Sequence, residues 1–171
     1  MQTVNQNIKP LTTKRNERGN LEIGGCDLVD LAKQHGTPLY VMCEETLRKI
    51  ANEYKTAFKY DKFRPTYASK ALLNTKIAEI LSSEGFGFDP VSMGEIYTIY
   101  KAGCDMNCVT FNGNNKTLEE IKLAVELGVG HFSIDNFYEI KILADELNKQ
   151  NKTIKALLRI TPGIECHTHE Y

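Results

Sequence analysis

The 171-residue sequence lacks several features that would assign it to a simple class. It has no apolar run long enough to span a bilayer, and its first twenty residues are polar, without the charged and then apolar segments of a secretory leader. The 21 basic and 22 acidic residues are spread along the chain, so the net charge of -1 favours neither phosphate backbones nor anionic membranes. We therefore expect a cytoplasmic protein without a nucleic-acid or membrane partner.

The five cysteines form an odd and scattered set with no CxxC pair. This usage indicates reduced thiols rather than a disulfide framework. Cys166, His167 and His169 bring both soft ligand types close together, but a strong zinc site normally uses two well-separated ligand pairs. The other histidines are His35 and His131. We therefore expect no metal, and interpret the segment around His167 as a loop over a site.

A nucleotide-binding glycine motif is also missing, because the sequence contains neither GxGxxG nor a P-loop. From residue 65 onward it shows a regular alternation instead. Strands are predicted at 65–69, 86–91, 107–111, 131–134 and 155–160, and amphipathic helices at 73–83, 93–102, 117–127 and 136–149. This alternation is typical of βαβ units in a parallel sheet, and it favours a TIM barrel over a doubly wound sheet.

The preceding part of the chain has a different pattern. Residues 1–19 are polar and lack periodicity, which indicates a loose lead-in or part of a surface β element. Four further elements are expected, namely a short strand at 21–23, a helix at 26–35 that Gly36 ends, a strand at 38–43 and a helix at 44–58.

Two local signals define the helix predicted at 117–127. Thr117 and Glu120 have the spacing of a capping box, in which each side chain binds the other residue's backbone N–H. Gly128 and Gly130 lie where the helix must end and lead into the next strand, and glycine tolerates the left-handed backbone that such an end uses.

Lys70 is the first candidate for chemistry, because it ends the strand-like run that begins at Pro65. An ammonium group at a buried strand end must be paired or desolvated. A partly desolvated lysine can lose its proton near neutral pH and attack an aldehyde, which is how a Schiff base to a cofactor forms. The alternative is a lysine that extends its charged end into solvent.

Other polar residues follow the remaining predicted strands. In a barrel the catalytic groups gather at the carboxyl ends of the strands. The groups predicted there are Asp89 with Ser92 and Glu95, the Asn112–Asn115 run, Asp135 with Asn136, and Arg159 with the residues that follow it.

Each of these groups also has a structural interpretation. Asp89 can simply turn the chain, and Glu95 falls in the first turn of a helix, where the dipole favours a carboxylate. Asn112–Asn115 can be a turn before the capped helix. Arg159 lies on an apolar strand and needs an anionic partner, whether or not it lines a site.

Five ordered motifs in the chain are similar to one enzyme family. They are YASKA (67–71), DPVSMGE (89–95), FNGNNKT (111–117), DNFYE (135–139) and LRITPGIECHTHEY (158–171). On these motifs the chain resembles the diaminopimelate decarboxylase family. These fold type III enzymes use pyridoxal 5'-phosphate (PLP) and share their barrel with alanine racemase and ornithine decarboxylase.

The resemblance implies a fold and a site. Residues 38–171 would form the first part of a PLP-binding (β/α)8 barrel of the alanine racemase type, incomplete in this chain, and residues 1–37 would pack with a C-terminal β domain. Lys70 would carry PLP, and Asp89, Glu95 and Arg159 would line the cofactor site. Five strands do not close an eight-stranded barrel, so we expect a fragment that is inactive alone.

The activity that the resemblance implies for the full-length protein is decarboxylation of meso-2,6-diaminopimelate to L-lysine by a homodimer. Two alternatives stay open. One is a related decarboxylase that acts on arginine, ornithine or carboxynorspermidine. The other is a barrel protein that binds PLP without catalysis.

Overall fold

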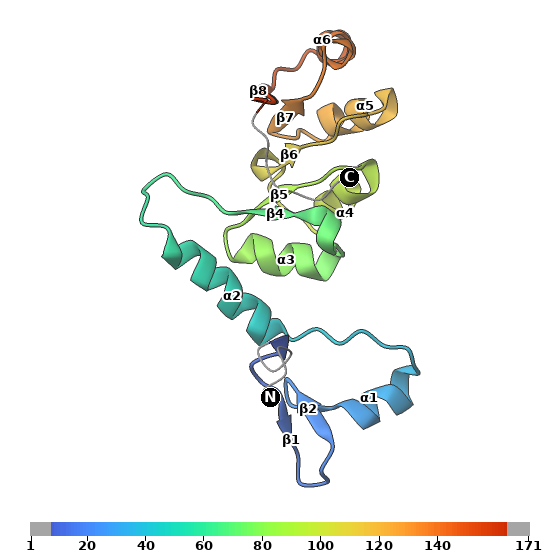
Figure 1. Ribbon diagram of the computed structural model, residues 1–171. Coiled ribbons are helices and arrows are strands. Elements are labelled where there is room, and N and C mark those ends of the chain that lie inside the picture. Colours follow the sequence, from blue (N-terminus) through green and yellow to red (C-terminus); the bar gives the residue numbers. More distant parts are fainter. Residues whose placement is uncertain (1–7, 164–171) are drawn as a thin grey trace. The chain divides into compact units, whose positions relative to one another are not determined.

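The computed structural model describes residues 8–163, which fall into two compact units that divide between Phe63 and Arg64. The predicted boundary at residues 37 and 38 concerned packing against a further domain, and it stays a prediction. Each unit has its own secondary structure (Figure 1).

The first unit begins with a small antiparallel sheet. Its strands are β1 (Lys14–Arg15), β2 (Leu21–Ile23) and β3 (Cys26–Asp27), paired in that order. Two helices follow, α1 (Leu28–His35) and α2 (Glu44–Ala57). Gly36 ends α1 with a φ of 82°, as the sequence predicted. The strand predicted at 21–23 and a surface β element before it are also confirmed.

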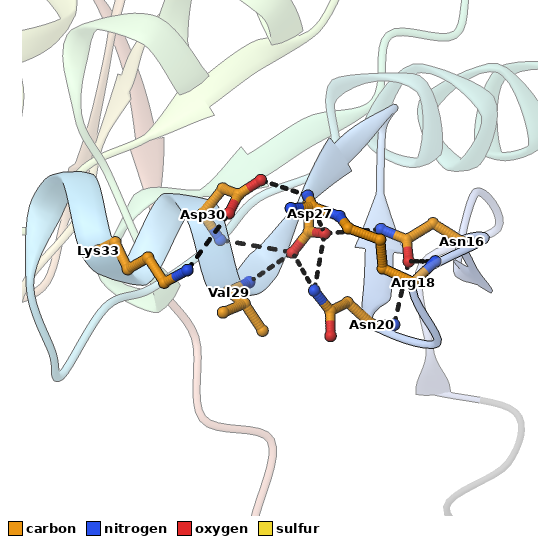
Figure 2. Close-up of polar contacts among 7 residues, drawn as sticks. All are labelled: Asn16, Arg18, Asn20, Asp27, Val29, Asp30 and Lys33. Carbon is orange, nitrogen blue, oxygen red and sulfur yellow. Dashed lines mark hydrogen bonds and ion pairs between the residues drawn. The ribbon is translucent and has the colours of Figure 1, made fainter.

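Asp27 connects the sheet to α1. Figure 2 shows that its carboxylate accepts hydrogen bonds from the Asn16 and Asn20 amides at 2.7 and 2.9 Å and from the Arg18 guanidinium at 2.6 Å. The same carboxylate caps α1 by accepting from the backbone N–H of Val29 at 2.9 Å. The hydrogen bonds from Asn20, which has the largest effect, from Asn16 and from the backbone N–H of Val29 hold the pKa of Asp27 well below its usual range.

The prediction of a strand at 38–43 is wrong, because the structure describes these residues and they form no strand. This segment has no regular secondary structure and no ladder partner, and Tyr40 in its middle is 97% exposed. An apolar run becomes a strand only where a neighbouring strand supplies hydrogen bonds, and none does so here.

The second unit contains the predicted alternation. Its strands are β4 (Thr66–Ala68), β5 (Gly87–Asp89), β6 (Thr110–Phe111), β7 (His131–Ile134) and β8 (Lys155–Leu158). The pairs β4–β5, β6–β7 and β7–β8 are parallel, and a bridge between Phe88 and Val109 connects β5 to the strand that follows it. Strand order thus follows chain order, as in a barrel, whereas a doubly wound sheet reverses its order.

Four helices connect these strands, namely α3 (Thr75–Ser83), α4 (Met93–Lys101), α5 (Leu118–Glu126) and α6 (Phe137–Gln150). Each begins at a polar residue whose side chain accepts a backbone N–H, and those residues are Asn74, Ser92, Thr117 and Asn136. The Thr117–Glu120 capping box is confirmed. Local capping therefore defines where each helix starts.

The core of this unit lies where strands and helices meet. Phe88, Phe111 and Phe132, from three neighbouring strands, are at most 1% exposed. The Phe111 and Phe132 rings meet edge to face with centroids 5.7 Å apart. The helices add Ile96, Ile99, Ile121 and Val125 to the buried set.

One of the two glycine expectations after α5 is wrong. Gly128 has a φ of 76° and ends the helix as predicted, but Gly130 does not have a positive φ. A Cβ on Gly130 would lie 2.7 Å from the carbonyl carbon of Asn107 and closer still to its oxygen. Gly130 is therefore required for close backbone approach rather than for a left-handed turn.

The outer strands of the described sheet are more exposed than the sequence indicates. All four residues of β8 are exposed, and only Tyr67 is partly buried in β4. Each of these strands has one neighbour among the described residues. Within the same residues no helix combines the length and apolar character needed to cross a membrane, and the described cysteines are free thiols.

Candidate active site

A cavity of about 570 Å³ lies at the carboxyl ends of the strands of the second unit. Its volume is within the range of small-molecule sites. Residues from the ends of β4, β5, β6 and β8 line it, and these are Ala68, Lys70, Asp89, Val91, the Asn112–Lys116 segment and Arg159. Of the four predicted site residues, the fold thus brings together Lys70, Asp89 and Arg159.

Lys70 follows β4 in a short 3-10 turn, Ser69–Ala71. The Tyr67 hydroxyl donates a hydrogen bond to the Leu72 carbonyl at 2.7 Å, which closes this turn across the lysine. Partial burial raises the pKa of Tyr67, so its hydroxyl stays protonated and able to donate at neutral pH. The turn holds the Lys70 backbone beside the cavity while its side chain is exposed.

Two lysines line the cavity, and only one has an available amine. The Lys116 Nζ donates to the Gly113 and Ser133 carbonyls at 2.8 and 2.6 Å and to the Glu139 carboxylate at 2.7 Å. The Lys70 Nζ makes no hydrogen bond or ion pair with residues 8–163. The structure therefore distinguishes Lys70 as the nucleophile candidate and Lys116 as a buried anchor.

Asp89 and Glu95 differ in their positions. Asp89 ends β5 and accepts a hydrogen bond from the Asn112 amide, so two cavity residues from neighbouring strands hold each other. Glu95 does not line the cavity. Its carboxylate accepts the backbone N–H of Val91 at 2.6 Å, and its own N–H donates to Ser92, which caps α4. Its predicted contact with a cofactor stays a prediction. In the structure Glu95 lies in the first turn of α4, and its carboxylate holds the backbone of Val91, which lines the cavity.

Arg159 lies directly after β8 with its side chain 60% exposed. Its guanidinium pairs with the Asp135 carboxylate at 3.4 Å, and its backbone N–H donates to the Ile134 carbonyl at 3.0 Å. The anionic partner expected from the sequence is thus at the end of β7. Because the pair is only partly buried, the guanidinium remains able to bind an anion in the cavity.

Lys116 and its partner Glu139 are site components that the sequence did not predict. Both side chains are almost fully buried, at 1% and 4% exposure. Glu139 stands three residues after the α6 cap, Asn136, as Glu120 does after Thr117. This Asn-x-x-Glu spacing was the available signal, although it indicates a helix start and not a partner for a lysine on another loop.

The predicted loop residues His167 and His169, with Cys166, lie outside the described residues. The expectation that they form a loop over the site, and not a metal centre, stays a prediction.

Fold and site together define an α/β barrel protein with its reactive groups at the carboxyl ends of parallel strands. A family model described as "Pyridoxal-dependent decarboxylase, pyridoxal binding domain" matches residues 44–171. The chain therefore belongs to the pyridoxal-dependent decarboxylases, and the family resemblance seen in the sequence is confirmed.

Curated relatives agree with this family. The chain is 44% identical over 162 residues to a diaminopimelate decarboxylase of Halalkalibacterium halodurans and 43% identical over 162 residues to that of Bacillus subtilis. Both alignments cover 94% of this chain and 37% of the relative. The chain thus spans little more than a third of the length of these proteins.

Solved structures agree on the fold. Diaminopimelate decarboxylase of M. jannaschii matches with a TM-score of 0.82 and 34% identity, over 92% of this chain and 38% of that one. A second structure of the M. jannaschii enzyme, in complex with L-lysine, matches with a TM-score of 0.82 and 33% identity, over 91% of this chain and 37% of that one. The five parallel strands therefore belong to a PLP-binding barrel of which the chain contains only a part, as predicted.

The cavity residues fit PLP, the cofactor that the family implies. An aldehyde requires a primary amine in reach, and Lys70 offers one without a competing partner among residues 8–163. Arg159 adds a cation at the same cavity, which suits an anionic cofactor or substrate. Asp89 and Asn112 add a carboxylate and an amide that are already oriented by each other.

Proposed function

We propose that this chain is part of a PLP-dependent decarboxylase that converts meso-2,6-diaminopimelate to L-lysine. The observation that carries the proposal is the Lys70 amine, which has no hydrogen-bond or ion-pair partner among residues 8–163 and lies on a cavity at the carboxyl ends of the barrel strands. The relatives named diaminopimelate decarboxylase, at 44% and 43% identity, support the substrate. PLP, when bound, supplies an aldehyde for the amine and a ring that accepts the electron pair released as CO2 departs.

The chain's own residues prepare this chemistry. Lys70 offers its Nζ as the nucleophile that holds the cofactor, on a turn that the Tyr67 hydroxyl closes. Arg159 neutralises negative charge in the cavity, and Asp135 limits how far its guanidinium can swing. Asp89, held by Asn112, would provide a fixed carboxylate at the same cavity. Orientation by such fixed groups lowers the barrier because little reorganisation is needed during the reaction.

A homodimer in the cytoplasm is part of the same proposal. Light scattering from the purified full-length protein would give twice the mass of one chain. A mass equal to one chain would contradict it.

Two rival functions remain to be tested against this one. Structures of a lysine/ornithine decarboxylase and of a viral arginine decarboxylase match at 22% and 20% identity, which supports the shared fold alone. Purified full-length protein should release CO2 from meso-2,6-diaminopimelate and not from ornithine, arginine or carboxynorspermidine. Release from none of them, with PLP bound, would favour the barrel protein without catalysis.

The assignment of Lys70 is tested separately by borohydride reduction and peptide mapping. Reduction makes a Schiff base between PLP and a lysine permanent, so the pyridoxyl group should be found on Lys70. Lys116 serves as the internal control, because it lines the same cavity with its amine engaged. Label on Lys116 or on any other lysine would refute the assignment.

A further inference from the structure

The Lys116–Glu139 ion pair is buried where the ends of β6 and β7 meet. Lys116 is 1% exposed and Glu139 is 4% exposed, and their charged groups are 2.7 Å apart. Nζ also donates to the Gly113 carbonyl at 2.8 Å and to the Ser133 carbonyl at 2.6 Å. Its three N–H donors thus have three acceptors, and the Phe111 ring lies 5.4 Å away.

Glu139 extends this contact toward Arg159. Its second carboxylate oxygen accepts the backbone N–H of Asp135 at 3.2 Å. The Asp135 side chain in turn pairs with Arg159 at 3.4 Å. A continuous path of hydrogen bonds and ion pairs therefore runs from Lys116 to a guanidinium that lines the cavity.

Stability alone does not explain such a pair. Removing two charges from water costs several kcal/mol per ion, and apolar residues of similar volume often stabilise a fold as well or better. What apolar residues cannot do is bind two carbonyls and an N–H from separate strand ends at fixed distances. The pair thus has a geometric effect, which is to hold the Asn112–Lys116 loop, the end of β7 and Asp135 in one arrangement.

We propose that Lys116 and Glu139 are positioning residues of the candidate active site, which act through Asp135 to orient Arg159 at the cavity. The inference rests on the proposed function, because it assigns the orientation to a decarboxylase site. Lys116 does not supply the reacting amine, because its Nζ is already bound to three acceptors.

The test replaces both charges together in the full-length protein, as Lys116→Met with Glu139→Met, so that no single buried charge is left unpaired. We expect the double variant to melt at a lower temperature than wild type, because the Gly113 and Ser133 carbonyls lose their donor and the Asp135 N–H loses its acceptor. Its kcat/KM per folded molecule should fall about 10- to 100-fold, as for other small misplacements of catalytic groups. Lys152→Met is the matched control. Its Nζ also donates to two carbonyls, those of Val125 and Glu126, but at the carboxyl end of α5 and away from the cavity. This control should lose stability and keep its turnover.

A second measurement identifies Arg159 as the residue acted upon. Arg159→Lys should cost much less activity in the double-methionine background than in wild type, because a guanidinium that is no longer oriented has less to lose. Equal losses in the two backgrounds would overturn the proposal. If the double variant does not fold, Asp135→Asn replaces it, since Asp135 is 22% exposed and its change leaves the buried pair intact. Wild-type kcat/KM in Asp135→Asn would overturn the proposal equally.

Failure of the proposed function would look different. Wild-type protein without borohydride label on Lys70, or without decarboxylation, would refute the function and the positioning role with it. Labelled and active wild type together with a fully active double-methionine variant would refute only the positioning role.

Discussion

The substitution Arg159→Lys tests whether Arg159 acts in the cavity or only supports the fold. The Arg159 side chain is 60% exposed, and its ion pair among the described residues joins it to Asp135 at 3.4 Å. An exposed pair of this kind contributes about 0 to 1 kcal/mol, and lysine keeps the charge, so the free energy of unfolding should fall by less than about 1 kcal/mol. Lysine cannot reproduce the rigid fork of guanidinium donors that faces the cavity. We expect kcat/KM to fall at least about tenfold, which corresponds to about 1.4 kcal/mol of transition-state stabilisation.

The assay compares two quantities in the same full-length preparation. Urea denaturation gives the free energy of unfolding, and CO2 release from meso-2,6-diaminopimelate gives kcat/KM per PLP bound. Arg18→Lys is the control, because Arg18 also pairs with carboxylates, those of Asp27 and Asp30, but lies in the first unit. It should lower stability and leave turnover unchanged. An Arg159→Lys variant that unfolds much earlier yet keeps wild-type turnover per folded molecule would refute the reasoning.

Two further predictions concern the fold. Gly130→Ala should destabilise the protein by about 1 to 3 kcal/mol or more, because the added Cβ meets the Asn107 backbone. Gly94→Ala in α4 should instead stabilise it by up to about 1 kcal/mol, because no atom lies within 4 Å of the added Cβ. Equal urea midpoints for the two variants would contradict both expectations. Since the pKa of Asp27 is lowered in the folded state, its stabilising contribution is complete above about pH 4 and is lost as the pH falls below that value. Asp27→Asn should flatten this acid dependence of the free energy of unfolding, and an unchanged slope between pH 2 and 4 would count against it.

Much of the second unit could be predicted because its signals are local. The strand at 131–134 has the predicted bounds, and the four helices begin within two residues of expectation. Helical periodicity and caps such as Thr117 depend on residues three or four positions apart, so they are visible in the sequence. The barrel's rule for strand ends then predicts the neighbourhood of Lys70, Asp89 and Arg159.

Other features depend on partners that are distant in the sequence. The segment at 38–43 has the composition of a strand, but a ladder needs a neighbour, and the described residues provide none. In the sequence Gly130 is typical of a turn. In the structure it is needed because the Asn107 backbone, 23 positions earlier, lies too close for a Cβ.

The sequence alone determined the alternating elements of the second unit, their order and the family, because these follow from local periodicity, caps and short motifs. The tertiary structure decided which of two cavity lysines has a free amine. Lys70 and Lys116 have the same ionisable group, and both follow a strand. They differ because the fold places two carbonyls and the Glu139 carboxylate within hydrogen-bond distance of the Lys116 Nζ, whereas the Lys70 Nζ makes no hydrogen bond or ion pair with the described residues. A long-range contact of this kind is set by packing and leaves no periodic signal in the chain.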